Sequence, residues 1–220
     1  MKDGILKIDN RTENWKTAKL YHERLSNACV VDFASKIIRA ADQEPGVIKR
    51  EDISVELFWK GFRDLRYSSS RDKQTINEKV LSKYKRAFRG LRNDVMGFPG
   101  LSAPRKHNYG MDDGCLAALV SNLMNTEIDI VIQTPAHLLI GEAKHTQALG
   151  AESKNLLVHQ LIRQYVMATV VAQISHHEWL KVVPFIVSTA PVRKRAQIRF
   201  MLRKGWLADG NLYGWDLKPL

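Results

Sequence analysis

The stretch from residue 126 to residue 145, TEIDIVIQTPAHLLIGEAKH, constrains the fold more than any other part of the chain. Two short apolar segments flank Pro135, and a proline at such a point favours a turn. The pattern therefore predicts two strands joined by a short connection. Successive side chains of a strand point to opposite faces, so Glu142 and Lys144 would share one face. If the two strands pair, Asp129 converges on the same edge of the sheet.

These three charged side chains lie beside the apolar run at residues 138–140. Charge placed so close to a core is costly unless something compensates it, and a divalent metal ion would do so. Mg²⁺ or Mn²⁺ takes oxygen ligands from one or two carboxylates and keeps water and phosphate oxygens in its other positions. Asp129, Glu142 and Lys144 therefore fit metal-assisted hydrolysis of phosphodiesters, in which a lysine orients the attacking water or offsets transition-state charge.

Apolar residues recur at helical spacing on both sides of this stretch. A segment with four Gly and two Pro, residues 89–110, is the predicted boundary. The chain is thus divided into a helical, basic N-terminal region, 1–110, and a core region, 111–220. Helices are predicted in the first region over residues 15–41, 54–66 and 73–88.

In the second region the predicted order is helix, strand, strand, helix and strand, which indicates an α/β fold whose second helix is a crossover. The first helix covers residues 112–125, and the second reaches residue 175 from Ser153 or Asn155. The last strand is the apolar run at 181–188, in which Pro184 indicates an edge or a bulge. A basic helix is expected at the C-terminal end, over 193–204.

Asp129 and the triplet Glu142-Ala143-Lys144, on paired strands with a helix on either side, resemble the PD-(D/E)XK nuclease superfamily. The resemblance covers residues 111–190 and implies a restriction-endonuclease-like core. It implies Mg²⁺ bound through Asp129, Glu142 and the backbone carbonyl of Ala143. The residue before Asp129 is Ile128 rather than proline, although the family varies there.

Members of this family often have a further acidic residue in the helix before the strands. Asp113 is the preferred metal ligand of this kind, whereas Asp112 is better explained as a helix N-cap. Glu127 is a third candidate because it shares a strand face with Asp129.

RecB-like branches of the family carry Gln-x-x-x-Tyr in the following helix. Gln160 begins a similar run here, but Tyr165 comes one position late for the full pattern. Gln160 is a candidate for contact with the substrate phosphate or with Lys144. The alternative is that Gln160 and Gln164 lie on a solvated edge of the helix.

A formal charge of +11, from 34 Lys and Arg against 23 Asp and Glu, favours polyanions as partners, nucleic acid first and anionic membranes second. Basic residues within 71–92 and 193–204 are candidates for contact with the DNA backbone, although solvated helix faces have a similar composition. DNA is the expected partner, and RNA is not excluded. A homodimer is also expected, because double-strand cleavage by a chain with one site generally needs two copies.

Other classes lack support in the sequence. Cys29 and Cys115 have no zinc-ligand spacing and fit a reducing compartment. There is no apolar segment of signal-peptide or membrane-span length, so a cytoplasmic protein without membrane contact is expected. The glycine-rich nucleotide loops, the HExxH zinc motif and the GxSxG hydrolase motif do not occur.

The leading hypothesis is a Mg²⁺-dependent DNase, in restriction, phage defence or repair, with Mn²⁺ as a substitute metal. The alternative is a catalytically silent nucleic-acid-binding protein with a nuclease fold. The Asp-Glu-Lys set argues against it, because binding alone does not need these three groups on one face. A basic α/β domain that acts through protein contacts is a third hypothesis.

Overall fold

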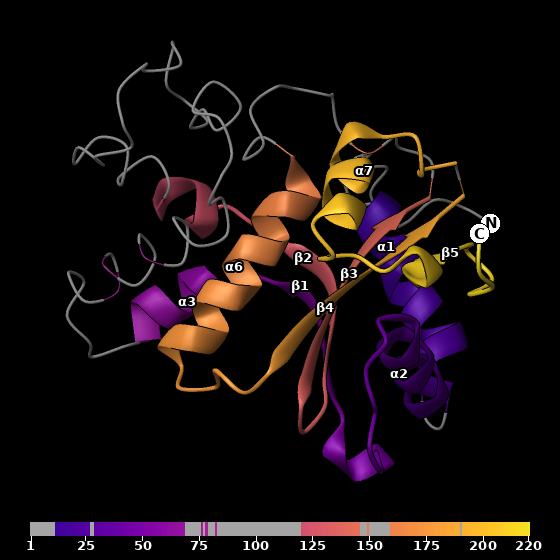
Figure 1. Ribbon diagram of the computed structural model, residues 1–220, viewed down its shortest axis with the longest axis horizontal. Coiled ribbons are helices and arrows are strands. Elements are labelled where there is room, and N and C mark those ends of the chain that lie inside the picture. The colour runs from indigo at the N-terminus through magenta and orange to yellow at the C-terminus, as the bar shows by residue number, and fades with distance from the viewer. Residues whose placement is uncertain are drawn as a thin grey trace.

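The computed structural model describes residues 12–26, 29–68, 76, 78, 82, 120–145, 149, 159–189 and 191–220. These residues form a mixed five-stranded sheet with helices on both faces, which is an α/β architecture (Figure 1). The strands follow one another across the sheet in chain order: β1 (Ser54–Trp59), β2 (Ile128–Gln133), β3 (His137–Lys144), β4 (Lys181–Ser188) and β5 (Leu212–Tyr213).

The two strands predicted within residues 126–145 are confirmed as the antiparallel pair β2 and β3. Their connection is closed by Thr134, whose backbone N–H donates to the carbonyl of His137 over 2.9 Å. The predicted strand at 181–188 is confirmed as β4, parallel to β3 along its whole length. On its other side β4 pairs with β5 only at Ile186 and Val187, so Pro184 precedes the paired part of that edge.

The helix predicted over residues 54–66 is wrong in its first half. Residues 54–59 form β1, which pairs antiparallel with β2, and only Gly61–Ser68 is helical (α3). The sheet therefore contains a strand from the N-terminal part of the chain. The alternation of Val55 and Leu57 with polar residues fits a strand, and the long-range partner β2 decides between the two structures.

The single helix predicted over residues 15–41 is also wrong, because the chain forms two helices there. The first is α1 (Thr12–Leu20), which continues as a π-helical turn, Tyr21–Leu25, to an extended Ser26. The second is α2 (Cys29–Ala40), whose buried residues line one side of the helix.

The face of the sheet opposite α1 and α2 is covered by α6 (Gln160–Ile174) and α7 (Ala196–Arg203), together with α3. Of the helix predicted over 112–125, residues 120–125 are described: residues 120–124 are helical and residue 125 lies in a turn. In the segment predicted over 73–88, residues 76, 78 and 82 are helical. The predicted boundary at 89–110 lies outside the described residues.

Apolar side chains fill both spaces between the sheet and its helices. On one face, residues of α1 and α2 such as Phe33 and Ile37 pack with Ile130, Leu139 and Phe185 of the strands. The opposite face is covered by α6 and α7, and its core includes these residues: Val131, Ile140, Ile162, Val166, Ile186 and Ile198. The sheet is thus a buried middle layer. No helix in the described part of the chain is long and apolar enough to cross a membrane.

Candidate active site

The structure brings Asp129, Glu142 and Lys144 together on the face of the sheet that α6 covers. The two-residue spacing along β3 places Glu142 and Lys144 on one face, and the Nζ atom of Lys144 lies 2.9 Å from Oε1 of Glu142. Glu142 is 1 % exposed and Asp129 is 8 % exposed, whereas the Lys144 side chain keeps some contact with solvent. Two carboxylates and an ammonium group therefore meet where β2 and β3 end their pairing.

Asp129 interacts with the backbone of β3 as well as with its side chains. The last β2–β3 pair in this direction is Ile130 with Gly141, and beyond it Oδ2 of Asp129 accepts a hydrogen bond of 2.9 Å from the N–H of Ala143. The carboxylate thus replaces a backbone acceptor at the point where the ladder stops. This contact fixes Asp129 beside the Glu142-Ala143-Lys144 triplet.

The strand on the other side of Asp129 is distorted at the same level. Leu57 pairs with Ile130 and Trp59 pairs with Ile128, so Phe58 stands opposite Asp129 in the register. The φ angle of Phe58 is 58°, in the left-handed region, which is unusual for a bulky residue and costs about 1–3 kcal/mol. A strained residue persists only where the surrounding structure holds it in place, and such residues commonly occur at functional sites.

The two carboxylates share an electrostatic environment that disfavours negative charge. Burial raises the pKa of Asp129 to about 8, and the nearby charge of Glu142 adds to the effect, against the Ala143 amide and Lys144. Burial also raises the pKa of Glu142, although Lys144 and Gln164 oppose this shift. A positive charge delivered to this pair would therefore be strongly favoured.

Gln164 is the glutamine of α6 that contacts the carboxylates. Its Nε2 donates to Oε2 of Glu142 over 2.6 Å and to the backbone carbonyl of Glu127 over 2.8 Å, and the side chain is buried. Gln160, which the sequence favoured, is the first residue of α6 and is only partly buried; the glutamine that is hydrogen-bonded to Glu142 is Gln164. The signal for Gln164 was present in the sequence, because it lies one helical turn after Gln160.

The acidic candidates for a third ligand differ in where they lie. Asp112 and Asp113 are outside the described residues. Glu127 is described, and its Oε2 forms an ion pair of 3.0 Å with Nζ of Lys60. Within the described part of the chain, no three His, Cys, Asp or Glu side chains form a group that could hold a metal ion.

Arg163 is a second residue near the site that the sequence analysis did not select. The charge of Glu142 opposes the lowering of the Arg163 pKa by burial, so the two groups influence each other. Its Nε atom is buried without a hydrogen-bond partner among the described residues. The sequence signal for Arg163 is its place in the first turn of α6, since a polar residue there can face the ends of the neighbouring strands.

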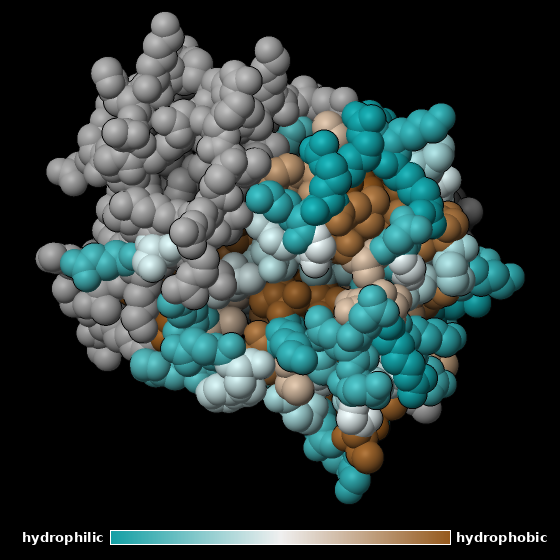
Figure 2. All heavy atoms as spheres, viewed as in Figure 1, coloured by the Kyte–Doolittle hydropathy of each residue, from teal (hydrophilic) through white to brown (hydrophobic). Residues whose placement is uncertain are grey.

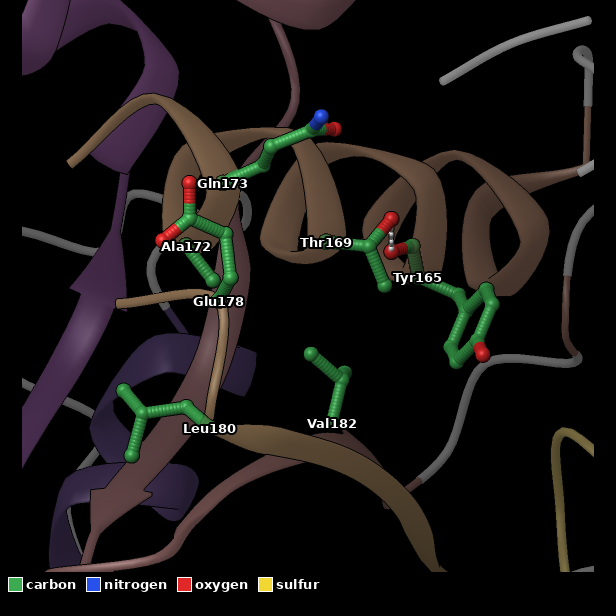
Figure 3. A pocket seen from close by; sticks show the side chains of 7 residues that line it. All are labelled: Tyr165, Thr169, Ala172, Gln173, Glu178, Leu180 and Val182. Atoms are coloured by element: carbon green, nitrogen blue, oxygen red, sulfur yellow. Dashed lines mark hydrogen bonds between the residues drawn. The ribbon is translucent and has the colours of Figure 1, made fainter. Parts of the chain in front are cut away.

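A separate cavity of about 250 Å³ lies between α6 and the start of β4 (Figure 3). Its lining comes from α6, from the following loop and from β4, and includes Tyr165, Thr169, Glu178 and Val182. The ring of Tyr165 stacks on Trp206 with a centroid distance of 4.5 Å. Tyr165 therefore serves the packing between α6 and the chain after α7, and the carboxylate cluster contributes nothing to this cavity.

Comparisons of the chain with protein-family models, with curated proteins and with solved structures find no match. The function must therefore be argued from the site itself.

Proposed function

We propose that this protein is a metal-dependent nuclease that hydrolyses DNA phosphodiester bonds at a site of the PD-(D/E)XK type. The observation that carries the proposal is the meeting of Asp129, Glu142 and Lys144 on one face of a buried antiparallel strand pair. The order of helical residues 120–124, strands β2 and β3, helix α6 and strand β4 supports a restriction-endonuclease-like core. Here β1 adds a further strand beside β2.

The donor chemistry of the site fits Mg²⁺. Asp129 and Glu142 offer carboxylate oxygens, and the Ala143 carbonyl between Glu142 and Lys144 would be a third hard ligand. Burial and the nearby charge of Glu142 raise the pKa of Asp129, so a cation beside the two carboxylates would be favoured. When bound, Mg²⁺ would polarise the scissile phosphate and promote ionisation of the attacking water.

The protein side chains have distinct roles in this proposal. Lys144 is held beside Glu142 while its side chain remains in reach of solvent, so its ammonium group can orient a phosphate and offset transition-state charge. Gln164 fixes the carboxylate plane of Glu142 through Oε2. The Ala143 N–H does the same for Asp129 through Oδ2.

The decisive experiment incubates the purified protein with plasmid DNA, linear DNA and RNA in Mg²⁺, in Mn²⁺ or in EDTA. Asp129→Asn and Lys144→Met are the test variants, because both keep the size of the side chain. Each should lower metal-dependent cleavage by roughly 10²-fold or more. Lys181→Met is the matched control, since Lys181 is an exposed lysine at the other end of the parallel strand pair.

Cleavage that requires the metal, fails in both test variants and persists in Lys181→Met would support the proposal. DNA binding without cleavage in any metal would instead identify a silent binding protein. Cleavage that both variants retain would place the chemistry elsewhere in the chain.

A further inference from the structure

Three arginines form a stripe along the outer side of α7. Arg199 and Arg203 are four residues apart in α7, so they lie on one face of the helix ~6 Å apart along its axis, and Arg195 is the N-cap residue one turn before Arg199. The inner face is fixed by the buried residues Gln197, Ile198, Phe200 and Met201. Because the inner face packs into the core, Arg199 and Arg203 are exposed, and Arg195 is partly exposed.

Among the described residues, no acidic side chain neutralises the positive charge of this arginine stripe. Arg193, just before the helix, forms an ion pair with Asp209. Within the part of the chain that the structure describes, Arg195, Arg199 and Arg203 form no ion pair. Exposed Lys194 and Lys204 lie near the two ends of the stripe, and Figure 2 shows hydrophilic residues gathered around α7.

The arginine stripe begins at the same end of the sheet as the carboxylate cluster. Lys144 pairs in register with Ser188, the last residue of β4, and a short connection then leads into α7. Oε1 of Gln197 accepts a hydrogen bond of 3.4 Å from the N–H of Leu161, which joins the first turns of α7 and α6. Figure 1 shows α7 beside this end of α6, from which Gln164 reaches Glu142.

We infer that Arg195, Arg199 and Arg203 bind the sugar-phosphate backbone of the DNA that the carboxylate site acts on. Guanidinium groups recognise phosphate through paired N–H donors, and a row of them along a helix neutralises several phosphates without reading the base sequence. The inference rests on the proposed function for its substrate. The binding itself needs no cleavage and can be measured alone.

The test measures binding of a fluorescently labelled duplex DNA in EDTA, at salt concentrations from about 50 to 200 mM. The variant carries Arg195→Gln, Arg199→Gln and Arg203→Gln, and its circular dichroism spectrum is checked against the wild type. The slope of log K against log salt should become shallower by about two to three units, because up to three phosphate contacts are lost. The matched control removes three exposed cations from the other face of the sheet: Arg24→Gln, Lys36→Gln and Arg39→Gln.

A shallower slope in the α7 variant together with an unchanged slope in the control would support the inference. Equal losses in both variants, or no loss in the α7 variant, would overturn it. Stripe-dependent binding of phosphatidylserine vesicles in place of DNA would also overturn it and would indicate a membrane surface. If the wild type binds DNA through the stripe but never cleaves it, the proposed function fails, and the stripe is still a DNA-binding surface. If the wild type cleaves DNA and the α7 variant binds and cleaves it equally well, the proposed function stands and the inference is overturned.

Discussion

Burial, together with the nearby charge of Glu142, raises the pKa of Asp129, so the stability of the folded chain should depend on pH. The Asp129 pKa is raised to about 8 in the folded chain, whereas an unfolded aspartate titrates near 3.9. The folded state therefore binds more protons between these two values. By linkage, the contribution of Asp129 to stability is present below about pH 4 and is lost as the pH rises towards 8.

The Asp129→Asn variant should remove this pH dependence. An asparagine oxygen still accepts the Ala143 N–H but carries no charge, so in EDTA the variant should be more stable than the wild type at pH 8 by about 1 kcal/mol or more. At pH 5 the difference should be smaller. Urea unfolding at several pH values measures it, and a difference that does not vary with pH would contradict the assignment.

Gln164 is the residue whose loss should disturb Glu142 most directly. Gln164→Leu keeps most of the buried volume but removes the donor to a buried carboxylate, so we expect a loss of about 1.5–3 kcal/mol in the free energy of unfolding. Urea denaturation measures this loss. Gln173→Leu on the same helix is the control, because the Gln173 Oε1 atom has no hydrogen-bond partner among the described residues and its removal should cost little. Similar losses in both variants would show that the Gln164–Glu142 bond is unimportant.

Strand β3 contains Glu142 and Lys144, and its backbone is tightly packed at Gly141, the residue that precedes Glu142. A Cβ atom added at Gly141 would lie 2.2 Å from Cζ of Phe185, its neighbour in register on β4. The Phe185 ring is itself held by an edge contact with Phe33 at 5.4 Å. Only glycine therefore fits at position 141 while Phe185 keeps this place.

The Gly141→Ala variant should lower stability by about 1–3 kcal/mol through overpacking, as measured by thermal or urea unfolding. Adding Phe185→Leu should recover part of this loss, because the two positions are in contact and their effects should not be additive. Gly210→Ala is a milder control, since its Cβ would meet only Ala40 at 3.0 Å. A Gly141→Ala protein as stable as the wild type would show that Phe185 can move aside.

The strands of the site could be predicted from the sequence because their signals are local. Alternation along β3 places Glu142 and Lys144 on one face, and the apolar character of β4 gives its limits directly. The strand β1 was missed because its apolar residues also fit a helix that continues to residue 66. Its structure depends on pairing with β2, about seventy residues later in the chain.

Two further features of the site depend on geometry that local patterns do not contain. Whether Gln160 or Gln164 meets Glu142 depends on the position of α6 along its own axis relative to the sheet, since the two glutamines lie near the same side of the helix, one turn apart. The break between α1 and α2 carries no glycine or proline before Ser26, so the spacing of apolar residues alone runs through it.

On the scale of the whole molecule, the buried sheet has one face with the carboxylate cluster and one face without it. One face is covered by α1 and α2, while α6 and α7 cover the face that contains the carboxylates. The acidic cluster is small and internal, and the chain as a whole carries a formal net charge of +11. An anionic polymer would thus be attracted by the molecule as a whole and would meet repulsion only at the carboxylates, where a divalent cation would remove it.

Mg²⁺ should therefore stabilise the folded protein as a whole. A ligand that binds only the native state raises the free energy of unfolding with concentration, by about 2.7 kcal/mol at one hundred times its Kd. Differential scanning fluorimetry should show a rise in Tm with Mg²⁺ that EDTA reverses and that Asp129→Asn and Glu142→Gln abolish. Glu178→Gln, an exposed carboxylate beside the separate cavity, should respond to Mg²⁺ as the wild type does. Neutralising either carboxylate removes a charged ligand and weakens the electrostatic attraction of the site for a cation. A rise in Tm as large in the two site variants as in the wild type would therefore mean that the ion binds elsewhere.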